Sequence, residues 1–414
     1  MAKRVFNTID LFAGCGGLMD GFQQEGHYNT VACVEWEKAP SETLAIRLER
    51  KWGHKNAKEE VIRFDIQRTD ELLNGFCDEE YGCHRGLKSI VGRKRVDVVI
   101  GGPPCQAYSL AGRIRDGKGM RDDYRNYLFE SYIKVVKAFS PSFFVFENVV
   151  GMLSAAPDGT PIVQKIKEGF NEAGYEVLSD FKNALYDVAD FGIPQHRKRV
   201  IILGVRKDIA NSNISCGDIL AYFYKQMNTH YKSHKTVSEA IGDLPALYPT
   251  ESVIKQNGKS FSHEPIQSEG YLNHIPRFHS KRDIDIFKKL AEDIESGRNE
   301  YVSTESLKKL YTDITGKQSN IHKFYVLRRD EPSNTIPAHL NKDGLRHIHP
   351  DSKQARSITV REAARLQTFP DDFEFVGSMM NQYKMIGNAV PVAFANIIAR
   401  ALISTINHYV SLLY

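Results

Sequence analysis

A cysteine at position 105 follows one of the most rigid turns that a chain can form. Residues 96–109 read VDVVIGGPPCQAYS, in which an apolar strand runs into two glycines and two prolines before the thiol. The prolines preset the backbone, so Cys105 is expected to point into a cleft as a pre-ordered nucleophile that reacts as the thiolate. A small buried hydrophobe is the alternative for a single cysteine. The glycine-rich stretch 111–120 that follows favours the functional interpretation.

Three further polar side chains are candidates for chemistry beside this thiol. Glu147 ends the apolar strand PSFFVFENV, where apolar surroundings favour a neutral carboxyl and therefore a proton donor. Arg197 and Arg199, in QHRKR, lie two apart at the start of a strand, so we expect them to face one side and bind one anionic or carbonyl group. A structural carboxylate and solvated edge charges are the alternatives.

A second group of residues indicates an adenosine-type cofactor. The glycines of AGCGG, residues 13–17, allow a sharp turn from strand to helix, and Glu35 ends the next strand, where a carboxylate can accept hydrogen bonds from ribose hydroxyls. AGCGG lacks the GxGxxG spacing of dinucleotide sites, which disfavours a pyrophosphate. Trp36 offers a flat face to an adenine or a sulfonium, and Asp65 could accept from an adenine amino group. An ordinary turn is the alternative for the glycines alone.

The candidates lie on a chain that alternates apolar strands with helices up to about residue 207. This alternation predicts a doubly wound α/β sheet, which binds ligands at the carboxyl ends of its strands. The candidate residues fall at those ends. The expected strands are RVFNTID, YNTVACVEW, VIRFDI, VDVVI, PSFFVFENV, YEVLSDFKNA and RVIILGV, and the main expected helices are SETLAIRLER, YLFESYIKVVKAF and PIVQKIKEGFNEAG.

The chain changes character beyond this region. Polar loops appear, and nine of the fourteen histidines lie between His230 and His349. We favour a loop-rich satellite domain with solvated or core-satisfied histidines over a metal site. The expected domains are therefore residues 1–207, a smaller second domain at 208–379, and a segment at 380–414 whose apolar helix VPVAFANIIARALISTI returns to pack on the sheet.

Composition limits the class of protein. The 414 residues are 42% hydrophobic and 26% charged, as in a soluble globular protein, and the net charge of +4 permits nucleic-acid binding without requiring it. Runs such as SFFVF and RVIILGV are too short to span a bilayer, and no secretion signal is expected. Six cysteines without a CxxC pair predict a reduced cytosolic chain with neither a disulfide nor a zinc framework. Cys77, Cys83 and His84 lack a fourth ligand, so no metal is expected there.

The motifs DLFAGCGG, Glu35-Trp36, GGPPCQ, ENV, QHRKR, REAARLQTFP and GNAVP resemble, in this order, those of the DNA cytosine-5 methyltransferases. The resemblance runs from about residue 7 to 395 and leaves 70–95 and 210–320 unmatched. It implies a Rossmann-like methyltransferase sheet with a loop-rich target-recognition domain, S-adenosylmethionine as the methyl donor and S-adenosylhomocysteine as the product. The implied cofactor-binding residues are Asp10, Phe12, Ala13, Gly14, Gly16, Gly17, Glu35, Trp36, Asp65, Ile66, Pro104, Leu128, Asn388 and Ala389.

The resemblance also implies roles for the four catalytic candidates. The Cys105 thiolate would add to C6 of a cytosine that has left the duplex, and Glu147 would hold or protonate N3. Arg199 would bind O2, and Arg197 would support the site or its phosphate contacts. Methylation at C5, loss of the C5 proton and elimination would then free the cysteine. The role of the insertion at 77–95 stays open. One interpretation is a surface insertion whose basic end touches phosphate.

The implied partner is double-stranded DNA. The methylase would either accompany a restriction endonuclease that acts as a separate protein or act alone. We expect no membrane association, a monomer, and a place in the bacterial cytosol or nucleoid. A tRNA cytosine-5 methyltransferase is one alternative, although the Cys-Phe-Thr tripeptide typical of that group is absent. A catalytically inactive DNA-binding relative and a small-molecule methyltransferase are the others.

Overall fold

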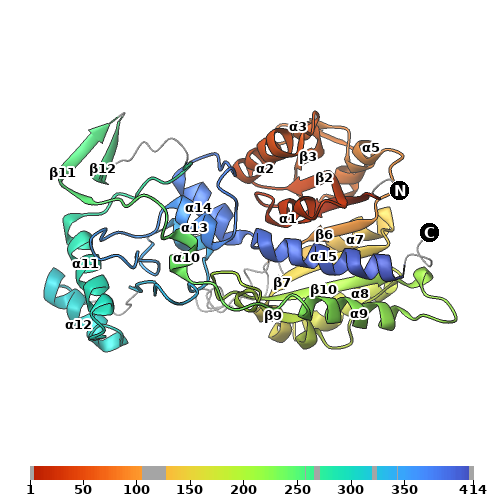
Figure 1. The fold of residues 1–414 in the computed structure, drawn as a ribbon. Helices are drawn as coiled ribbons and strands as arrows, with labels where there is room; N and C mark the ends of the chain where they lie inside the picture. The colour runs from red at the N-terminus through yellow and green to blue at the C-terminus, as the bar shows by residue number, and fades with distance from the viewer. Residues whose placement is uncertain are drawn as a thin grey trace. The chain divides into compact units, whose positions relative to one another are not determined.

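The computed structural model of the chain describes residues 4–104, 127–256, 258–264, 271–318, 324–342 and 344–409. Cys105 and the stretch 111–120 lie outside the described residues. The chain divides into two compact units, drawn in Figure 1. The first unit takes residues 1–191, 198–232 and 389–414, and the second takes 192–197 and 233–388.

The first unit is built on one mixed sheet, which confirms the predicted α/β class. Its strand order is β3-β2-β1-β6-β7-β10-β8, with β9 paired to β10. The strands from β3 to β7 are parallel, whereas β10 is antiparallel to its neighbours. The strands are β1 Phe6–Leu11, β2 Tyr28–Glu35, β3 Val61–Arg63, β6 Val98–Gly101, β7 Phe143–Val149, β8 Tyr175–Glu176, β9 Leu185–Asp187 and β10 Lys198–Arg206.

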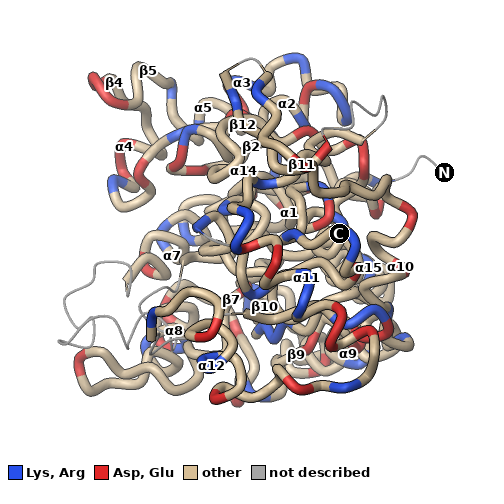
Figure 2. Tube along the Cα trace, turned by 90° about the vertical axis from the view of Figure 1, so that its left-hand side faces the viewer, with Lys and Arg blue, Asp and Glu red and all other residues tan. Residues whose placement is uncertain are grey.

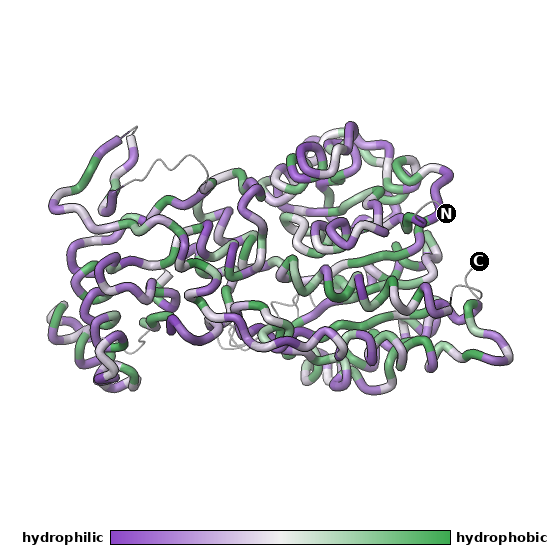
Figure 3. Tube along the Cα trace, viewed as in Figure 1, coloured by the Kyte–Doolittle hydropathy of each residue, from purple (hydrophilic) through white to green (hydrophobic). Residues whose placement is uncertain are grey.

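The order reverses beside β1, because β2 follows on one side of it and β6 on the other. Ligands bind at such a switch point in open α/β sheets, outside the carboxyl ends of the strands. The central strands are mostly apolar and mostly buried, and they appear mainly in the hydrophobic colour in Figure 3. A ligand-binding site is therefore expected at the turns after β1, β2, β6 and β7.

Helices flank the sheet of the first unit. In the view of Figure 1, α1 and α15 lie in front of it. A Cβ atom on Gly21 would lie 2.4 Å from the Cβ of Ala395, so a glycine is needed for α1 to pack this closely on α15. The helices are α1 Gly17–Glu25, α2 Lys38–Trp52, α3 Ala57–Glu60, α4 Thr69–Asn74, α5 Leu87–Val91, α7 Leu128–Phe139, α8 Ile162–Glu172, α9 Cys216–Asn228 and α15 Val392–His408, with 3₁₀ turns at Val150–Ser154, Phe181–Ala184, Val188–Asp190 and Lys207–Ile209.

The apolar helix predicted near the C-terminus is α15. The stretch Met379–His408 is long and apolar enough to cross a membrane by length and composition, and it is longer than the short apolar runs noted in the sequence. However, 72% of the tested window is buried inside the protein. Such burial is typical of a core helix.

The second unit has an apolar core cluster around Phe287 and Leu290, and buried polar contacts support it elsewhere. The helix α13 begins with a reciprocal cap in which the Thr359 hydroxyl accepts from the Glu362 N–H and the Glu362 carboxylate accepts from the Thr359 N–H. The same carboxylate takes two 2.7 Å bonds from buried Arg356. The elements are α10 Val237–Ile241, β11 Pro249–Gln256, β12 Lys259–His263, α11 Lys281–Glu295, α12 Thr304–Thr315, α13 Val360–Leu366 and α14 Met379–Asn388, with a 3₁₀ turn at Ala338–Asn341.

Several histidines of this unit are buried and hydrogen-bonded, which confirms the core-satisfied interpretation for them. Nε2 of His263 lies 2.8 Å from the Gln354 carbonyl, and Nε2 of His274 lies 2.9 Å from the Pro245 carbonyl. The backbone N–H of Ser357 donates to His279. Among the described residues, no group of three or more histidine, cysteine or acidic side chains could hold a metal ion.

The expectation of a chain without disulfides is wrong at one hairpin. The strands β4 Phe76–Asp78 and β5 Gly82–His84 pair antiparallel, with Cys77 directly opposite Cys83. Their Cα atoms are 3.9 Å apart, and the structure joins the two residues by a disulfide. The spacing gave no hint of this pairing because only the hairpin register brings the two thiols face to face. Figure 2 shows the acidic tip of this hairpin, residues 78–80.

Candidate active site

The glycine motif forms a left-handed turn at the end of β1. Phe12, Gly14 and Gly16 have positive φ values of 57°, 56° and 94°. A positive φ is unfavourable for a bulky residue such as Phe12, and strained backbone of this kind gathers at functional sites. A Cβ atom on Gly14 would meet nothing within 4 Å, so this position faces open space. Ala13 is buried, and its N–H donates to the Val34 carbonyl, which fixes the turn against β2.

The segment Ala389–Val390 closes over the start of α1. A Cβ atom on Gly17 would lie 2.4 Å from the Val390 carbonyl oxygen and 3.2 Å from the Cβ of Ala389. Glycine at this position therefore permits a close approach of two backbones. The structure thus brings Ala389, a predicted cofactor-binding residue, to the glycine turn, whereas Asn388 ends α14 in the second unit.

Glu35 is fixed at the end of β2 by two backbone donors. Its Oε2 accepts from the Gly14 N–H at 2.8 Å and its Oε1 accepts from the Glu37 N–H at 2.7 Å. Burial raises the pKa of this carboxyl, although the two N–H donors act to lower it. Because each oxygen uses one bond to the backbone, each keeps acceptor capacity for a ligand hydroxyl.

Asp10 is the most buried acid of the site. One of its oxygens accepts from the Met19 N–H at 3.2 Å, and the other, Oδ1, is buried without a hydrogen-bond partner in the structure. Burial raises the pKa of the Asp10 carboxyl well above its usual range, and the nearby Glu35 adds to this. An unmatched acceptor of this kind is costly inside a protein.

The remaining predicted cofactor residues line the neighbouring strand ends. Trp36 is 52% exposed, and its Nε1 donates to the hydroxyl of Tyr81 at 2.9 Å. Asp65 follows β3 and accepts from the Gln67 N–H at 3.0 Å. Ile66 and Leu128 are buried apolar side chains. Tyr81 was missed in the sequence because the contact with Trp36 spans 45 positions and no local pattern marks it.

Close contacts explain why the two residues before the prolines are glycines. A Cβ atom on Gly101 would lie 2.4 Å from the Leu11 carbonyl oxygen, and one on Gly102 would lie 2.5 Å from Oε2 of Glu147. Any side chain at Gly102 would displace the carboxylate. The Nδ2 of Asn148 donates to the Pro103 carbonyl at 3.5 Å, which ties the ENV segment to the same turn. Pro104 is the last described residue before Cys105.

Glu147 and Arg199 form an ion pair on adjacent strands. Nε of Arg199 lies 2.6 Å from Oε1 of Glu147, and both side chains are largely buried at 13% and 12% exposure. The antiparallel register of β10 on β7 places Arg199 opposite Val149, two residues beyond Glu147. The carboxylate therefore does not lie in purely apolar surroundings, as the sequence suggested, but beside a cation.

Arg197 has different partners. It belongs to the second unit, where its Nη1 donates to the Ile336 carbonyl at 3.0 Å and its Nη2 to the Gly387 carbonyl at 3.1 Å. Gln195 likewise accepts from the Ile336 N–H at 2.9 Å. These bonds support the second unit. A joint role of Arg197 and Arg199 at one ligand stays a prediction.

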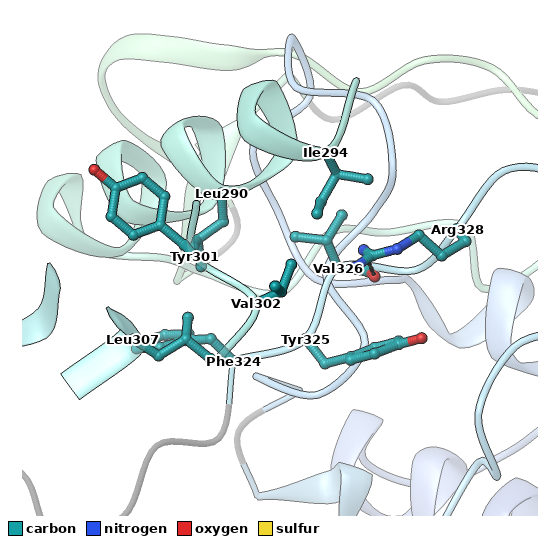
Figure 4. Close-up of a pocket in the computed structure, with 9 residues that line it drawn as sticks. All are labelled: Leu290, Ile294, Tyr301, Val302, Leu307, Phe324, Tyr325, Val326 and Arg328. Carbon is teal, nitrogen blue, oxygen red and sulfur yellow. Dashed lines mark hydrogen bonds between the residues drawn. The ribbon is translucent and has the colours of Figure 1, made fainter. Parts of the chain in front are cut away.

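A small cavity lies elsewhere, in the second unit. It has a volume of about 60 Å³ and is drawn in Figure 4. None of the residues predicted for catalysis or cofactor binding lines it. The lining residues are Leu290, Ile294, Tyr301, Val302, Leu307, Phe324, Tyr325, Val326 and Arg328.

Comparison with known proteins defines the class. The model of the C-5 cytosine-specific DNA methylase family matches residues 6–404. The Type II methyltransferase M.Bpa9945I of Bacillus paralicheniformis is 34% identical over 97% of this chain and 99% of its own length. The Type II methyltransferase M.DdeI of Desulfomicrobium norvegicum is 33% identical over 96% of this chain and 88% of its own length. The chain therefore belongs to the C-5 cytosine-specific DNA methylase family and is a DNA cytosine-5-methyltransferase.

Solved structures share the fold. A chain described as a DNA modification methyltransferase encoded within an E. coli prophage has a TM-score of 0.60 and 24% identity, covering 97% of this chain and 99% of its own. The Dnmt2 methyltransferase of S. pombe has a TM-score of 0.54 and 13% identity, covering 98% and 100%. At these identities the likeness concerns the fold alone.

Proposed function

We propose that the protein transfers a methyl group from S-adenosylmethionine to C5 of a cytosine flipped out of a specific duplex DNA sequence, through a covalent bond between Cys105 and C6. The observation that carries the proposal is the Glu147–Arg199 pair packed over Gly102, in the turn that leads to Cys105. A carboxyl group and a cation therefore lie at the turn that leads to Cys105.

The residues around the glycine turn fit S-adenosylmethionine. Gly14 faces open space, and both Glu35 oxygens retain acceptor capacity for ribose hydroxyls. Trp36 and Ile66 would flank the adenine, with Asp65 accepting from its amino group. Phe12, Ala13, Leu128 and Ala389 would complete the apolar walls. When bound there, S-adenosylmethionine supplies an electrophilic methyl group on a sulfonium.

The chain's own residues would act on the cytosine ring. The Cys105 thiolate forms a bond to C6, and the electron pair of the C5–C6 double bond moves to C5. Glu147 would hold or protonate N3, and Arg199 would bind O2, so that negative charge does not accumulate on the ring. After C5 gains the methyl group, it loses its proton to a base. The C6–S bond then breaks and returns the thiolate.

The second unit would read the DNA sequence. Its β11–β12 hairpin is exposed along most of its length, and in Figure 1 it extends from the body of that unit. A two-stranded ribbon fits the major groove, and Lys255 and Lys259 supply positive charge near its tip. Arg197, through Ile336 and Gly387, would support this unit rather than touch the base.

The biological setting follows from the relatives. The curated relatives are named Type II methyltransferases. We infer that this chain is likewise the modification enzyme of a bacterial restriction-modification system, or a solitary methylase. It would act as a monomer in the cytosol, with any cognate endonuclease as a separate protein.

The test is transfer of labelled methyl from S-adenosylmethionine to mixed-sequence duplex DNA and, separately, to tRNA. We expect label in DNA only, recovered as 5-methylcytosine after hydrolysis, and none with Cys105→Ala. Label in tRNA alone would contradict the proposal. The buried Cys216→Ala variant is the matched control, because Cys216 lies in α9 and should not affect transfer.

A further inference from the structure

The insertion that the family motifs leave unexplained forms the β4–β5 hairpin. Its base is held by apolar stacking, because Phe76 lies on Phe64 with ring centroids 3.7 Å apart and planes inclined by 15°. Its turn is held by Asp78, whose Oδ2 pairs with Arg68 at 2.7 Å and whose Oδ1 accepts from the Tyr81 N–H at 2.7 Å. The hairpin is therefore anchored to the segment that follows β3.

These anchors place Tyr81 at the edge of the predicted cofactor site. The Tyr81 ring meets Phe64 edge-on at 5.1 Å, and the Arg63 guanidinium lies 5.2 Å from its centroid. The Tyr81 hydroxyl accepts the hydrogen bond from Nε1 of Trp36 at 2.9 Å. Burial raises the pKa of this hydroxyl, although the hydrogen bond from Trp36 acts to lower it.

The contact with Tyr81 matters because it orients an indole that is open to solvent over about half of its surface. The indole is 52% exposed, and a half-exposed side chain loses rotamer freedom when a ligand packs on it. A hydrogen bond made before the ligand arrives removes part of that cost. The hydroxyl is bonded to the indole edge and leaves the ring faces for stacking.

We propose that Tyr81 is a positioning residue of the cofactor site, which holds the Trp36 indole in the orientation that receives the adenine ring. The inference rests on the proposed function, since it takes the cofactor to be S-adenosylmethionine. Tyr81 acts through Trp36 and touches no reacting atom. The insertion thereby gives this chain a preformed adenine wall.

The test removes the hydroxyl and keeps the ring. In Tyr81→Phe, the packing on Phe64 and Arg63 remains while the bond to Trp36 is lost. We expect the Kd and the KM for S-adenosylmethionine to rise roughly three- to ten-fold, as for one net hydrogen bond, with kcat unchanged at saturating cofactor. Tyr231→Phe is the control, because Tyr231 also lies in the first unit and its side chain is 51% exposed, and this variant should bind like wild type.

A second readout needs no cofactor. The chain has two tryptophans, so a Trp52→Phe background leaves Trp36 as the only emitter. We expect the fluorescence anisotropy of Trp36 to fall in Tyr81→Phe, as the indole gains rotational freedom. If Tyr81→Phe bound S-adenosylmethionine like wild type, or left the anisotropy unchanged, the inference would be overturned and the proposed function would stand. If wild type itself bound no S-adenosylmethionine, the proposed function would fail and this inference with it.

Discussion

At the scale of single residues, the Glu147 carboxylate and its surroundings constrain each other. One oxygen of Glu147 pairs with Arg199, and the other lies where a side chain on Gly102 would stand. The carboxylate is therefore fixed from two sides, as electrostatic and acid–base catalysis requires. Small changes at Arg199 or Gly102 are expected to lower the rate of methyl transfer more than the stability of the fold.

Glu147→Gln should lower kcat by about 100-fold or more, because an amide cannot supply the proton at N3. The amide oxygen can still accept from Arg199, so we expect the fold and the affinity for S-adenosylmethionine to remain. Steady-state methyl transfer measures the effect. The exposed Glu168 of α8, changed to Gln, is the control. An unchanged kcat would remove Glu147 from the proposed chemistry.

Gly102→Ala tests whether the space beside the Glu147 carboxylate must stay free of a side chain. The new methyl group would lie 2.5 Å from Oε2 of Glu147, so the carboxylate must move. We expect a loss of kcat of similar size to that of Glu147→Gln, with thermal stability largely kept. Gly217→Ala is matched to it, because the nearest atom to that Cβ is 3.4 Å away. Wild-type activity in Gly102→Ala would show that the carboxylate position is not critical.

Sequence reasoning proposed the residues of this candidate site but not their contacts. Glu35, Glu147 and Arg199 follow from strand ends in an alternating chain, which is a local signal. The ion pair of Glu147 depends on strand register, and the bond between Trp36 and Tyr81 depends on an inserted hairpin. Neither is visible in a periodicity or a motif.

At the scale of elements, the motif REAARLQTFP serves mainly as a scaffold. Arg361 donates to the carbonyls of Leu272, Pro370 and Phe373, and Glu362 is both the cap of α13 and the partner of Arg356. These buried bonds leave the charges no role at a ligand. The β11–β12 hairpin differs from this motif, because most of its side chains contact solvent and can therefore reach a ligand.

Replacing Lys255 and Lys259 together by alanine should weaken DNA binding and make it less sensitive to salt. If both contact phosphates, the slope of log affinity against log salt should fall by up to about 2. Fluorescence binding titrations from low to high salt measure this. Lys281→Ala with Lys288→Ala, two exposed lysines of α11, is the matched pair and should leave the slope unchanged. Equal slopes for both pairs would exclude the hairpin as a DNA contact.

Sequence patterns predicted most strands of the sheet, because buried strands are largely apolar. The expected strand YEVLSDFKNA is wrong over most of its length, since only Tyr175–Glu176 form a strand and Phe181–Ala184 form a 3₁₀ turn. The patterns also failed at the β4–β5 hairpin, where short strands bring Cys77 opposite Cys83. Two three-residue strands carry too few side chains for a period to appear. Their pairing follows from the turn and from packing on Phe64.

At the scale of the whole molecule, the second unit buries histidines in the neutral form. Burial lowers the pKa of His263 and His347 to about 4, and that of His279 and His349 to about 3. In the unfolded chain these groups titrate near 6.5. Below that pH, the unfolded state therefore binds protons that the folded state does not.

The free energy of unfolding should consequently fall as the pH drops from about 6.5 towards 4, by roughly 1.4 kcal/mol per pH unit for each such histidine. Urea unfolding at pH 7.5, 6 and 5 measures this. His279→Gln keeps an acceptor for the Ser357 N–H and should flatten the dependence. A stability that did not change between pH 7.5 and 5 would show that these side chains are not buried in neutral form.

The most direct test of the account is to trap the covalent intermediate. Duplex DNA carrying 5-fluorocytosine cannot lose its C5 substituent as a proton, so the bond between Cys105 and C6 should persist after methyl transfer. With S-adenosylmethionine we predict a denaturant-stable complex of protein and DNA, retained in Cys216→Ala and absent in Cys105→Ala. A complex that persists in Cys105→Ala, or methylation of ordinary DNA by that variant, would contradict the account.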